Sequence, residues 1–528
     1  EQPSHIIKRN PLISPMDSSN HTYFNKLIDT DQDDFDVIII GGGLTGLTSA
    51  YNILKKHAGL SVLIIEQHDK VGGRLLIDDV GFYANSFQKH ICRLIDQLDL
   101  IINHGKNNDD KQRVFYTKNG PDMDEISSID ACQIFYFIES LHTSSMESRF
   151  KLYSTKDFDC RKIAEISVND FLRQNLLTTK AKALCQSMIY AVCGARNLEN
   201  ISCLWLFVML HNSGGFFQRF KLAICNNTRY FIKGGMIEIV NRLRDNIVKE
   251  HGIIHCSEVV KKINFNEIRV WITTTLKTYK CSYVIIAIPP PTNMEIIIEP
   301  ILSDNILTTQ TLYHTEKNIY FQAKYKSSFW DLKYCGSIIS TFDSGVNLKI
   351  AYNASHKDNE EELNILAGFL TKQSNESSKL LNIFHTINKS FGFNNENIAH
   401  EYIEYKEYEC QNPMAILKPC SIDHHINPML KPFKRIYFAS SEYAREFPGT
   451  ADGAIEAGEH VACFVLHHVR PQVLDISQLI EYLQVIFYLP PKTSPKYELF
   501  TEKDWAGAIL MITNVVILIT FFQSAYFS

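Results

Sequence analysis

The 528-residue chain has no excess of basic residues and no basic run. Its 53 lysines and arginines are outnumbered by 58 aspartates and glutamates, which gives a formal net charge of −5 at pH 7. Because a protein that binds the phosphates of nucleic acid normally carries a basic patch, we expect no nucleic-acid partner. Apolar residues make up 45% of the chain and charged residues 21%, a composition typical of a globular protein.

The sequence also lacks a CxxC pair and an HExxH motif. The closest two of its 13 cysteines, Cys185 and Cys193, are eight residues apart, whereas structural zinc sites usually begin with cysteines separated by about two to four residues. We therefore predict no metal site. Most cysteines are expected to be small buried residues in a reducing compartment, although the spacing leaves room for a few disulfides.

Long apolar runs are absent except at the C-terminal end. Residues 1–34 are polar and show no sustained apolar period, so we expect a disordered arm, and no signal-peptide pattern is visible. Residues 505–523 carry no charge and are long enough to cross a bilayer as a helix. This pattern predicts a transmembrane tail anchor joined by a linker over 470–504, and a buried C-terminal helix is the alternative.

Between these ends, short β-branched runs alternate with helical patterns, which is typical of an α/β fold. The clearest strands are expected at 36–40, 61–66, 283–288 and 435–439. No internal repeat is present.

The strongest local pattern is a GxGxxG motif between a strand and a helix. Gly41, Gly43 and Gly46 follow the strand at 36–40 directly, and a helix is predicted over 47–56. In such a motif the first glycine allows a tight turn, the second lets the backbone approach a pyrophosphate, and the third lets helix and strand pack closely. A glycine turn without a ligand is the alternative, but the strand–turn–helix–strand order is the context that a dinucleotide site requires.

Neighbouring residues extend this pattern. Leu44 and Thr45 lie at the helix N-terminus, where free N–H groups and the positive end of the helix dipole favour a phosphate. Glu66 ends the second strand and can accept hydrogen bonds from both hydroxyls of an adenosine ribose. Because its charge disfavours a 2′-phosphate, the predicted ligand is FAD or NAD rather than NADP.

The segment DKVGGR at residues 69–74 favours FAD. Here the chain resembles the flavin-containing amine oxidase superfamily, whose members carry a second glycine pair and an arginine just past the ribose acid. The resemblance implies that Gly73 lies at the cofactor and that Arg74 neutralises the second phosphate bidentately. A solvated surface arginine is the alternative for Arg74.

Four further blocks match this superfamily in its order, at residues 203–215, 230–236, 283–291 and 435–462. Together with the apolar C-terminal segment, the pattern is most similar to the monoamine oxidases of the mitochondrial outer membrane. The resemblance implies a discontinuous Rossmann-like FAD-binding domain, of the p-hydroxybenzoate-hydroxylase type, interleaved with an α+β substrate domain.

Domain boundaries follow from the order of these blocks. The FAD-binding domain is expected to comprise residues 35–84, 217–291 and 406–469. The substrate domain is expected to comprise residues 85–216 and 292–405.

The resemblance also implies further cofactor contacts. An adenine contact is expected near Val259, after a short strand at 253–260. Glu442 stands at the family's acidic position in the last block, and the backbone at Thr450 and Ala451 is expected at the pyrimidine edge of the flavin.

Positions that face the substrate depart from the family. Monoamine oxidases hold the amine between two tyrosines, and counting without gaps places Thr450 and Pro413 at these positions. Tyr320 stands where the family has a lysine that holds a water at the flavin, with Lys317 nearby. Asn212 replaces a glutamine that lines the chamber. These four residues, Tyr320, Asn212, Thr450 and Pro413, are the candidate catalytic set.

Covalent attachment of the flavin is doubtful on this alignment. The family links a cysteine to the flavin immediately before the second tyrosine, where this chain has Asn412. Cys410 is the nearby candidate, and a plain loop cysteine is the favoured interpretation.

The resemblance implies an FAD-dependent amine oxidase that converts a primary or secondary amine to an aldehyde while O₂ is reduced to H₂O₂. Because the substrate-facing residues are altered, the alternatives are an impaired FAD-binding relative that serves as a binding or scaffold protein, and a dehydrogenase of another substrate such as a porphyrinogen or polyene. The implied partners are a small amine, O₂ and a lipid bilayer, with a homodimer left open. The mitochondrial outer membrane is the favoured location and the endoplasmic reticulum the alternative.

Overall fold

The computed structural model describes residues 33–76, 84–105, 114–117, 120–122, 126–147, 158–224, 228–290, 295–332, 337–358, 361–371, 377–393, 401–409, 414–420 and 430–486. Most of the predicted arm, the predicted anchor over 505–523 and the end of the predicted linker lie outside these residues, as do Cys410, Asn412 and Pro413. Among the described helices, none is long and apolar enough to cross a membrane. The anchor and the localisation therefore stay predictions.

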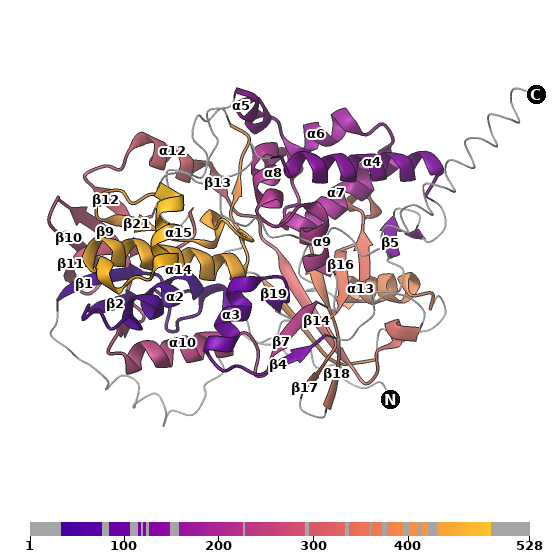
Figure 1. Ribbon diagram of the computed structural model, residues 1–528. Coiled ribbons are helices and arrows are strands. Elements are labelled where there is room, and N and C mark those ends of the chain that lie inside the picture. The colour runs from indigo at the N-terminus through magenta and orange to yellow at the C-terminus, as the bar shows by residue number, and fades with distance from the viewer. Residues whose placement is uncertain are drawn as a thin grey trace, which may run out of the picture.

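The chain folds around two large sheets, one on the left and one at the lower right of Figure 1. The first contains β1 (Asp34–Ile40), β2 (Val62–Ile65), β8 (Ile253–His255), β9 (Val260–Phe265), β10 (Val270–Thr274), β11 (Thr278–Ile286), β12 (Ile297–Glu299) and β21 (Ile436–Phe438). Five strands run parallel in the order β8–β2–β1–β11–β21, and β10 and β9 form an antiparallel extension beside β11. This order confirms the predicted α/β class and its Rossmann-like sheet.

Helices cover one face of this sheet. They are α2 (Leu44–Leu54), α3 (Lys89–Gln97), α10 (Ile237–Lys249), α14 (Ala451–Val469) and α15 (Ile476–Ile486). The long helix α14 packs along α2 in front of the sheet, and α3 packs against α14 (Figure 1). Segments from the beginning and the end of the chain therefore form one layer.

Residues of β1 alternate between two cores. Val37 and Ile39 lie in the core beneath the helices, whereas Ile38 and Ile40 lie in the core shared with β9 and β10. All four are buried. Because both faces of the strand are covered, it reads in the sequence as a continuous apolar run.

The second sheet contains β5 (Val114–Thr117), β6 (Gly120–Asp122), β14 (Ile319–Tyr325), β15 (Ser337–Ser340), β16 (Leu348–Asn353), β17 (His356–Asp358), β18 (Glu361–Leu370) and β19 (Tyr402–Glu409). Its order is β19–β14–β18–β16–β15–β5–β6, and most neighbours are antiparallel. Its strands lie within the ranges predicted for the substrate domain, except residues 406–409 of β19, which were assigned to the FAD-binding domain.

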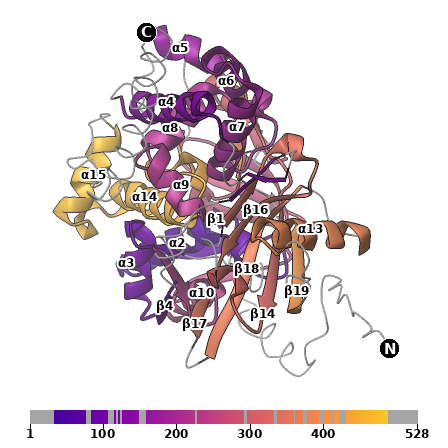
Figure 2. The ribbon, with the colours of Figure 1, turned by 90° about the vertical axis from the view of Figure 1, so that its right-hand side faces the viewer.

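Helices gather above one end of the second sheet (Figure 2). They are α4 (Ser128–Ser145), α5 (Phe158–Glu165), α6 (Val168–Asn175), α7 (Thr179–Cys193), α8 (Cys203–His211) and α9 (Phe216–Ile224), with α12 (Asp304–Leu312) and α13 (Ser377–Ser390) elsewhere. Two small sheets complete the described structure, formed by β3 (Ala84–Asn85), β4 (Ile102–His104) and β7 (Arg229–Ile232), and by β13 (Tyr313–His314) and β20 (Ile416–Leu417).

Two local predictions were wrong in detail. The strand expected at 253–260 is two strands, β8 and β9, because Ser257 adopts a positive φ of 59° and turns the chain between them. The start of the predicted linker, for which no helix was predicted, forms α15. Its Tyr482 stacks on His467 of α14, with 3.7 Å between the ring centroids, so burial of an apolar helix face favours the helix there.

Three segments pack differently from their predicted domains. Helix α3 contributes its apolar side to the core of the first sheet, and β12 pairs with β9 in that sheet. Helix α9, in contrast, packs on α4 and α7 of the helical region. In each segment the buried apolar face, rather than the order of family blocks, determines the side on which the element packs.

Candidate functional site

The GxGxxG turn has the geometry expected of a dinucleotide-binding loop. Gly41 has a φ of +105°, and a Cβ atom there would lie 2.7 Å from the carbonyl oxygen of Ala287. At Gly46 a Cβ atom would lie 2.0 Å from the carbonyl oxygen of Gly41. At Gly43, by contrast, no described atom lies within 4 Å of a Cβ position. The loop is therefore tight at its ends and open at its centre.

Gly43 is also the N-cap of α2, which begins at Leu44 and continues through Thr45. The capping position has no side-chain hydrogen bond, so the first backbone N–H groups of the helix face the opening at Gly43. Free N–H groups at a helix N-terminus attract anions, and a pyrophosphate is the anion that a dinucleotide supplies.

Glu66 directly follows β2 and is held by the backbone. Its Oε2 accepts a hydrogen bond from the N–H of Gly42 at 2.6 Å, and its Oε1 accepts one from the N–H of His68 at 2.9 Å. The residue is 6% exposed. Each carboxylate oxygen has a second lone pair, so Glu66 is fixed in place and can still accept two ribose hydroxyls.

The second glycine pair, Gly72 and Gly73, lies directly across from the GxGxxG turn. Gly72 forms a parallel bridge with Gly43 and donates its N–H to the carbonyl oxygen of Gly42 at 2.8 Å. Gly72 and Gly73 have φ angles of +134° and +54°, which favour glycine at both positions. The two glycine turns thus enclose the opening at Gly43.

Arg74 forms an ion pair with a buried glutamate. Its Nη2 lies 2.6 Å from Oε1 of Glu442, and its Nη1 donates to Oγ of Ser441 at 2.9 Å. Burial alone would raise the pKa of Glu442, but the charge of Arg74 and hydrogen bonds from Ser440 and the N–H of Ala415 lower it to about 2. The carboxylate is therefore ionised and neutralised internally. The predicted contact of Arg74 with a phosphate stays a prediction.

Val259 lies in the link between β8 and β9, close to the ribose acid. The N–H of Glu258 donates to the carbonyl oxygen of Glu66 at 3.0 Å, and Val259 exchanges backbone and hydroxyl hydrogen bonds with Thr275. The buried Glu258 carboxylate also accepts hydrogen bonds from the hydroxyls of Thr274 and Tyr279. This network holds the predicted adenine contact beside Glu66.

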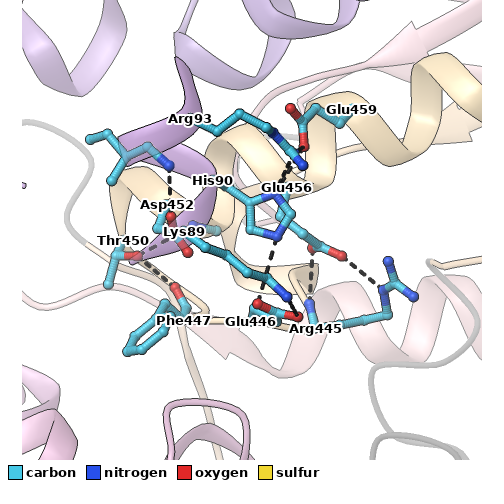
Figure 3. A network of polar contacts seen from close by, with 12 residues as sticks. Lys89, His90, Arg93, Arg445, Glu446, Phe447, Thr450, Asp452, Glu456 and Glu459 are labelled. Carbon is cyan, nitrogen blue, oxygen red and sulfur yellow. Dashed lines mark hydrogen bonds and ion pairs between the residues drawn. The ribbon is translucent and has the colours of Figure 1, made fainter. Parts of the chain in front are cut away.

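The N-terminus of α14 is capped by Thr450. Its Oγ1 accepts a hydrogen bond from the N–H of Gly453 at 3.3 Å and donates to the carbonyl oxygen of Phe447 at 2.7 Å (Figure 3). Gln88 donates from Nε2 to the same hydroxyl at 3.4 Å. Thr450 therefore has a capping role, and Ala451 begins the helix.

A charged cluster joins α3 to α14 (Figure 3). His90 lies 2.8 Å from Glu459 through Nδ1 and 3.6 Å from Glu446 through Nε2, while Lys89 pairs with Glu446 and Arg93 with Glu459. Burial lowers the pKa of His90, but its hydrogen bonds to the two glutamates outweigh this effect and raise it to about 10. The imidazolium therefore ties helix α3 to the loop before α14 and to α14 itself.

Asp452 lies in the first turn of α14 and is fully buried. Its Oδ1 accepts a hydrogen bond from the N–H of Ile91 at 2.8 Å, and its Oδ2 has no partner in the described part of the chain. Burial raises its pKa to about 6, against the opposing charge of His90. Asp452 thus binds the start of α3 to the start of α14.

Replacement of His90 by glutamine is expected to flatten the dependence of stability on pH. A pKa raised from 6.5 to about 10 stabilises the fold fully below pH 6.5 and loses that contribution as the pH rises through 10. Between these pH values, the free energy of unfolding of the wild type is expected to fall by about 2–4 kcal/mol more than that of H90Q. Denaturant unfolding at several pH values measures this difference.

The exposed His385 of α13 provides the matched control. The variant H385Q should keep the wild-type pH profile. An H90Q profile parallel to that of the wild type would contradict the charge assignment for His90.

On the substrate side, Asn212 meets the loop that precedes α14. Its carbonyl oxygen accepts a hydrogen bond from the N–H of Phe447 at 3.0 Å, and its Nδ2 is buried without a partner among the described residues. Asn212 therefore lies close to the loop that Thr450 caps, and its catalytic role stays a prediction.

Tyr320 and Lys317 lie at and just before β14. The Tyr320 ring packs on Phe369 with 4.4 Å between centroids. Lys317 is 80% exposed and pairs with Glu409 at 2.7 Å. It points to solvent and does not replace the family lysine. Pro413 lies outside the described residues.

Met414 is a residue that the gap-free count missed. A Cβ atom at Gly449 would lie 1.9 Å from its sulfur, so the Met414 side chain lies directly beside the residue that precedes Thr450. Its neighbour Ala415 donates its N–H to Glu442 at 3.0 Å.

Asn85 and Gln88, which no sequence motif marks, are also connected to Thr450. Gln88 accepts a hydrogen bond from the N–H of Asn85 at 3.1 Å and reaches Thr450 with its other end. Both residues precede an amphipathic helix and belong to no motif, so no signal in the sequence marks them.

The residues present fit an FAD molecule. An opening lies at Gly43 between two glycine turns, and the fixed carboxylate of Glu66 stands where the ribose is expected. The side-chain amide of Asn85 and the side-chain nitrogen of Asn212 are buried without a partner among the described residues. Buried polar groups without a protein partner are rare and call for a ligand or an ordered water. Fold and site together define an α/β dinucleotide-binding protein with an attached substrate domain.

Comparison with protein families identifies the family of dinucleotide-binding proteins to which the chain belongs. The family model of flavin containing amine oxidoreductases matches residues 44–466. The chain belongs to this family, which implies FAD as its cofactor. It is similar to amine oxidase [flavin-containing] B of Bos taurus, with 24% identity over 82% of this chain and 86% of the relative. It is also similar to amine oxidase [flavin-containing] A of Canis lupus familiaris, with 25% identity over 82% and 85%.

Solved structures support the same fold. Cyclohexylamine oxidase from Brevibacterium oxydans IH-35A has a TM-score of 0.71 at 18% identity, covering 82% of this chain and 99% of its own. Putrescine oxidase bound to putrescine has a TM-score of 0.69, with the same identity and coverage. These similarities confirm the architecture of a Rossmann-like domain with a substrate domain.

Proposed function

We propose that the chain is an FAD-dependent amine oxidase that converts a small amine to an aldehyde and reduces O₂ to H₂O₂. The observation that carries the proposal is the family match over 44–466, which extends through both the nucleotide-binding sheet and the substrate sheet. The relatives named above are amine oxidases, and one of the similar structures holds putrescine. The geometry of the glycine turns and Glu66 supports binding of the cofactor.

The chain's own residues divide into those that hold the cofactor and those that face the substrate. The helix N-terminus at Leu44 binds the pyrophosphate, Glu66 binds the ribose, and Val259 contacts the adenine. The N-terminus of α14, at Thr450 and Ala451, meets the pyrimidine edge, where the positive end of the helix dipole favours negative charge. When bound, FAD accepts a hydride from the carbon next to the amine nitrogen and passes the electrons to O₂.

The substrate side orients the amine with few aromatic groups. Thr450 uses its hydroxyl to cap α14, and Met414 beside Gly449 presents an apolar, polarisable side chain. Tyr320 offers a hydroxyl and an aromatic face at the position of the family lysine. We infer a preference for amines with an apolar substituent, because Met414 presents an apolar side chain beside Gly449.

A second candidate is a binding or scaffold protein that retains FAD without efficient turnover. The specific observation in its favour is that Thr450 stands where a tyrosine is expected. Its hydroxyl is engaged in capping α14, and it has no aromatic ring whose electron-rich face could orient an amine. Loss of such orienting contacts would slow hydride transfer without affecting cofactor binding.

Anaerobic mixing of the FAD-loaded protein with a panel of aromatic and aliphatic amines separates the two candidates. The proposed enzyme is expected to lose the visible absorption of oxidised flavin on mixing and to recover it when O₂ is admitted, with H₂O₂ and an aldehyde released. Dithionite provides the control, because it should bleach the flavin in either case. An unchanged spectrum with every amine, together with normal bleaching by dithionite, would exclude the oxidase.

A further inference from the structure

Asn85 is a fully buried residue whose side chain has no protein partner. It ends the short strand β3, where its backbone pairs with Arg229 of β7. It is 0% exposed, and both Oδ1 and Nδ2 lack a hydrogen-bond partner among the described residues. Neither the donor nitrogen nor the acceptor oxygen of this buried amide therefore has a hydrogen-bond partner. Such groups in native proteins normally meet a ligand or an ordered water.

The backbone around Asn85 is rigidly held. Its N–H donates to Oε1 of Gln88 at 3.1 Å, and its carbonyl oxygen accepts the N–H of Gln88 and the thiol of Cys92. Gln88 in turn reaches Oγ1 of Thr450, the cap of α14. Asn85 is therefore fixed one side chain away from the helix N-terminus that is proposed to meet the pyrimidine edge of the flavin.

Neighbouring polar groups do not satisfy the amide. Gln88 uses both ends of its own side chain, in the contacts with Asn85 and Thr450. Asp452 also has an unpaired oxygen in the first turn of α14, but an ionised carboxylate offers acceptors and no donor. Among the buried side-chain amides of the described residues, Asn85 is the one whose oxygen and nitrogen both lack a partner.

This pairing of donor and acceptor discriminates between the ligands that the site could hold. The pyrimidine edge of a flavin presents a ring N–H flanked by two carbonyl oxygens, which complements a side-chain amide atom for atom. A protonated amine presents donors only and would leave Nδ2 unsatisfied. Adenine is assigned above to Glu66 and Val259, at the other end of the cofactor, and is therefore not the group proposed for Asn85.

We propose that the side-chain amide of Asn85 binds the pyrimidine edge of the isoalloxazine ring. Its Oδ1 accepts the hydrogen bond from ring N3–H, and its Nδ2 donates to the adjoining carbonyl oxygen. Asn85 is thus a residue that sets the affinity for flavin and the reduction potential, in addition to the backbone groups at α14. This inference rests on the proposed binding of FAD but not on amine oxidation.

The test compares FAD binding by the wild type, N85A and the isosteric N85D, using full-length apoprotein titrated with FAD. Both variants are expected to bind FAD about tenfold or more weakly, because two hydrogen bonds are lost or disrupted. Their flavin spectra should shift and their reduction potentials become more negative, since a donor to the carbonyl oxygen stabilises the reduced ring. Asn264 of β9, remote from α14, provides the matched control, and N264A should bind FAD as the wild type does.

A flavin lacking the ring N–H sharpens the test. The wild type is expected to discriminate against N3-methyl-FAD, and N85A should lose most of that discrimination. Melting curves of the apoproteins establish that each variant is folded, and N85D keeps the experiment decisive if N85A does not fold.

Variants with wild-type affinity, spectrum and potential would overturn the inference, whatever happens to the KM for an amine. A wild type that binds FAD but oxidises no amine would refute the proposed activity and leave the Asn85 comparison intact. A wild type that takes up no FAD would overturn both.

Discussion

Replacement of Gly46 by alanine is expected to destabilise the protein by about 3 kcal/mol or more. The added Cβ atom would lie 2.0 Å from the carbonyl oxygen and 3.2 Å from the carbonyl carbon of Gly41, and both atoms belong to the backbone. Helix α2 would have to move away from β1, and the loop between them would lose its shape. Denaturant unfolding of the apoprotein measures the loss of stability, and a titration with FAD measures the loss of binding.

Gly43 provides the matched control on the same loop. Its φ of −72° suits alanine, and no described atom lies within 4 Å of a Cβ position there. The variant G43A should therefore keep the stability of the wild type while binding FAD more weakly, since the new methyl group enters the space assigned to the pyrophosphate. A G43A protein with unchanged FAD affinity would contradict the position of the phosphate, and a stable G46A protein would contradict the packing.

Replacement of Arg74 by methionine is expected to cost about 3–5 kcal/mol of stability at neutral pH. Methionine keeps much of the side-chain volume but leaves the buried carboxylate of Glu442 without its counter-charge. A pKa lowered from 4.5 to about 2 stabilises the fold above pH 4.5, and this contribution is lost as the pH falls through 2. In R74M the free energy of unfolding should therefore rise, relative to the wild type, as the pH is lowered.

The double variant R74M/E442Q tests whether this cost comes from the pair. Neutralising Glu442 removes the unpaired buried charge, so the double variant is expected to be more stable than R74M alone. A double-mutant cycle by denaturant unfolding gives the coupling energy between the two residues. A coupling energy near zero would contradict the assignment of this ion pair as the main partner of Glu442.

Local patterns predicted the strand–turn–helix–strand unit at 34–66 well. The strand β1, the glycine turn and Glu66 fall within about thirty consecutive residues, and each follows from steric or hydrogen-bonding demands that act over a few positions. The strands predicted at 61–66, 283–288 and 435–439 appear as β2, β11 and β21 for the same reason. Their apolar runs reflect burial on both faces.

Local patterns could not predict contacts between segments that are far apart in the sequence. His90 and Glu459 are separated by 369 residues, and nothing in either segment indicates that they meet. The pairing of Arg74 with Glu442 is similar, because the motif around Arg74 points to a phosphate while the fold supplies a carboxylate. Met414 belongs to no motif, and its contact with Gly449 is formed only in the folded chain.

Tertiary packing also changed the secondary structure of one segment. The region after α14 was predicted to be a linker and no helix was expected there, but α15 gains stability by packing Tyr482 against His467 and Phe464. Packing of an apolar face contributes more to such a helix than its intrinsic propensity does.

Uptake of FAD by the purified full-length chain tests the central claim most directly. The account predicts that apoprotein titrated with FAD binds about one FAD per chain, acquires the visible absorption of a protein-bound flavin and retains it through gel filtration. It also predicts that G43A binds more weakly in the same experiment. A folded wild-type protein that remains colourless after reconstitution, with no FAD eluting alongside it, would contradict the account.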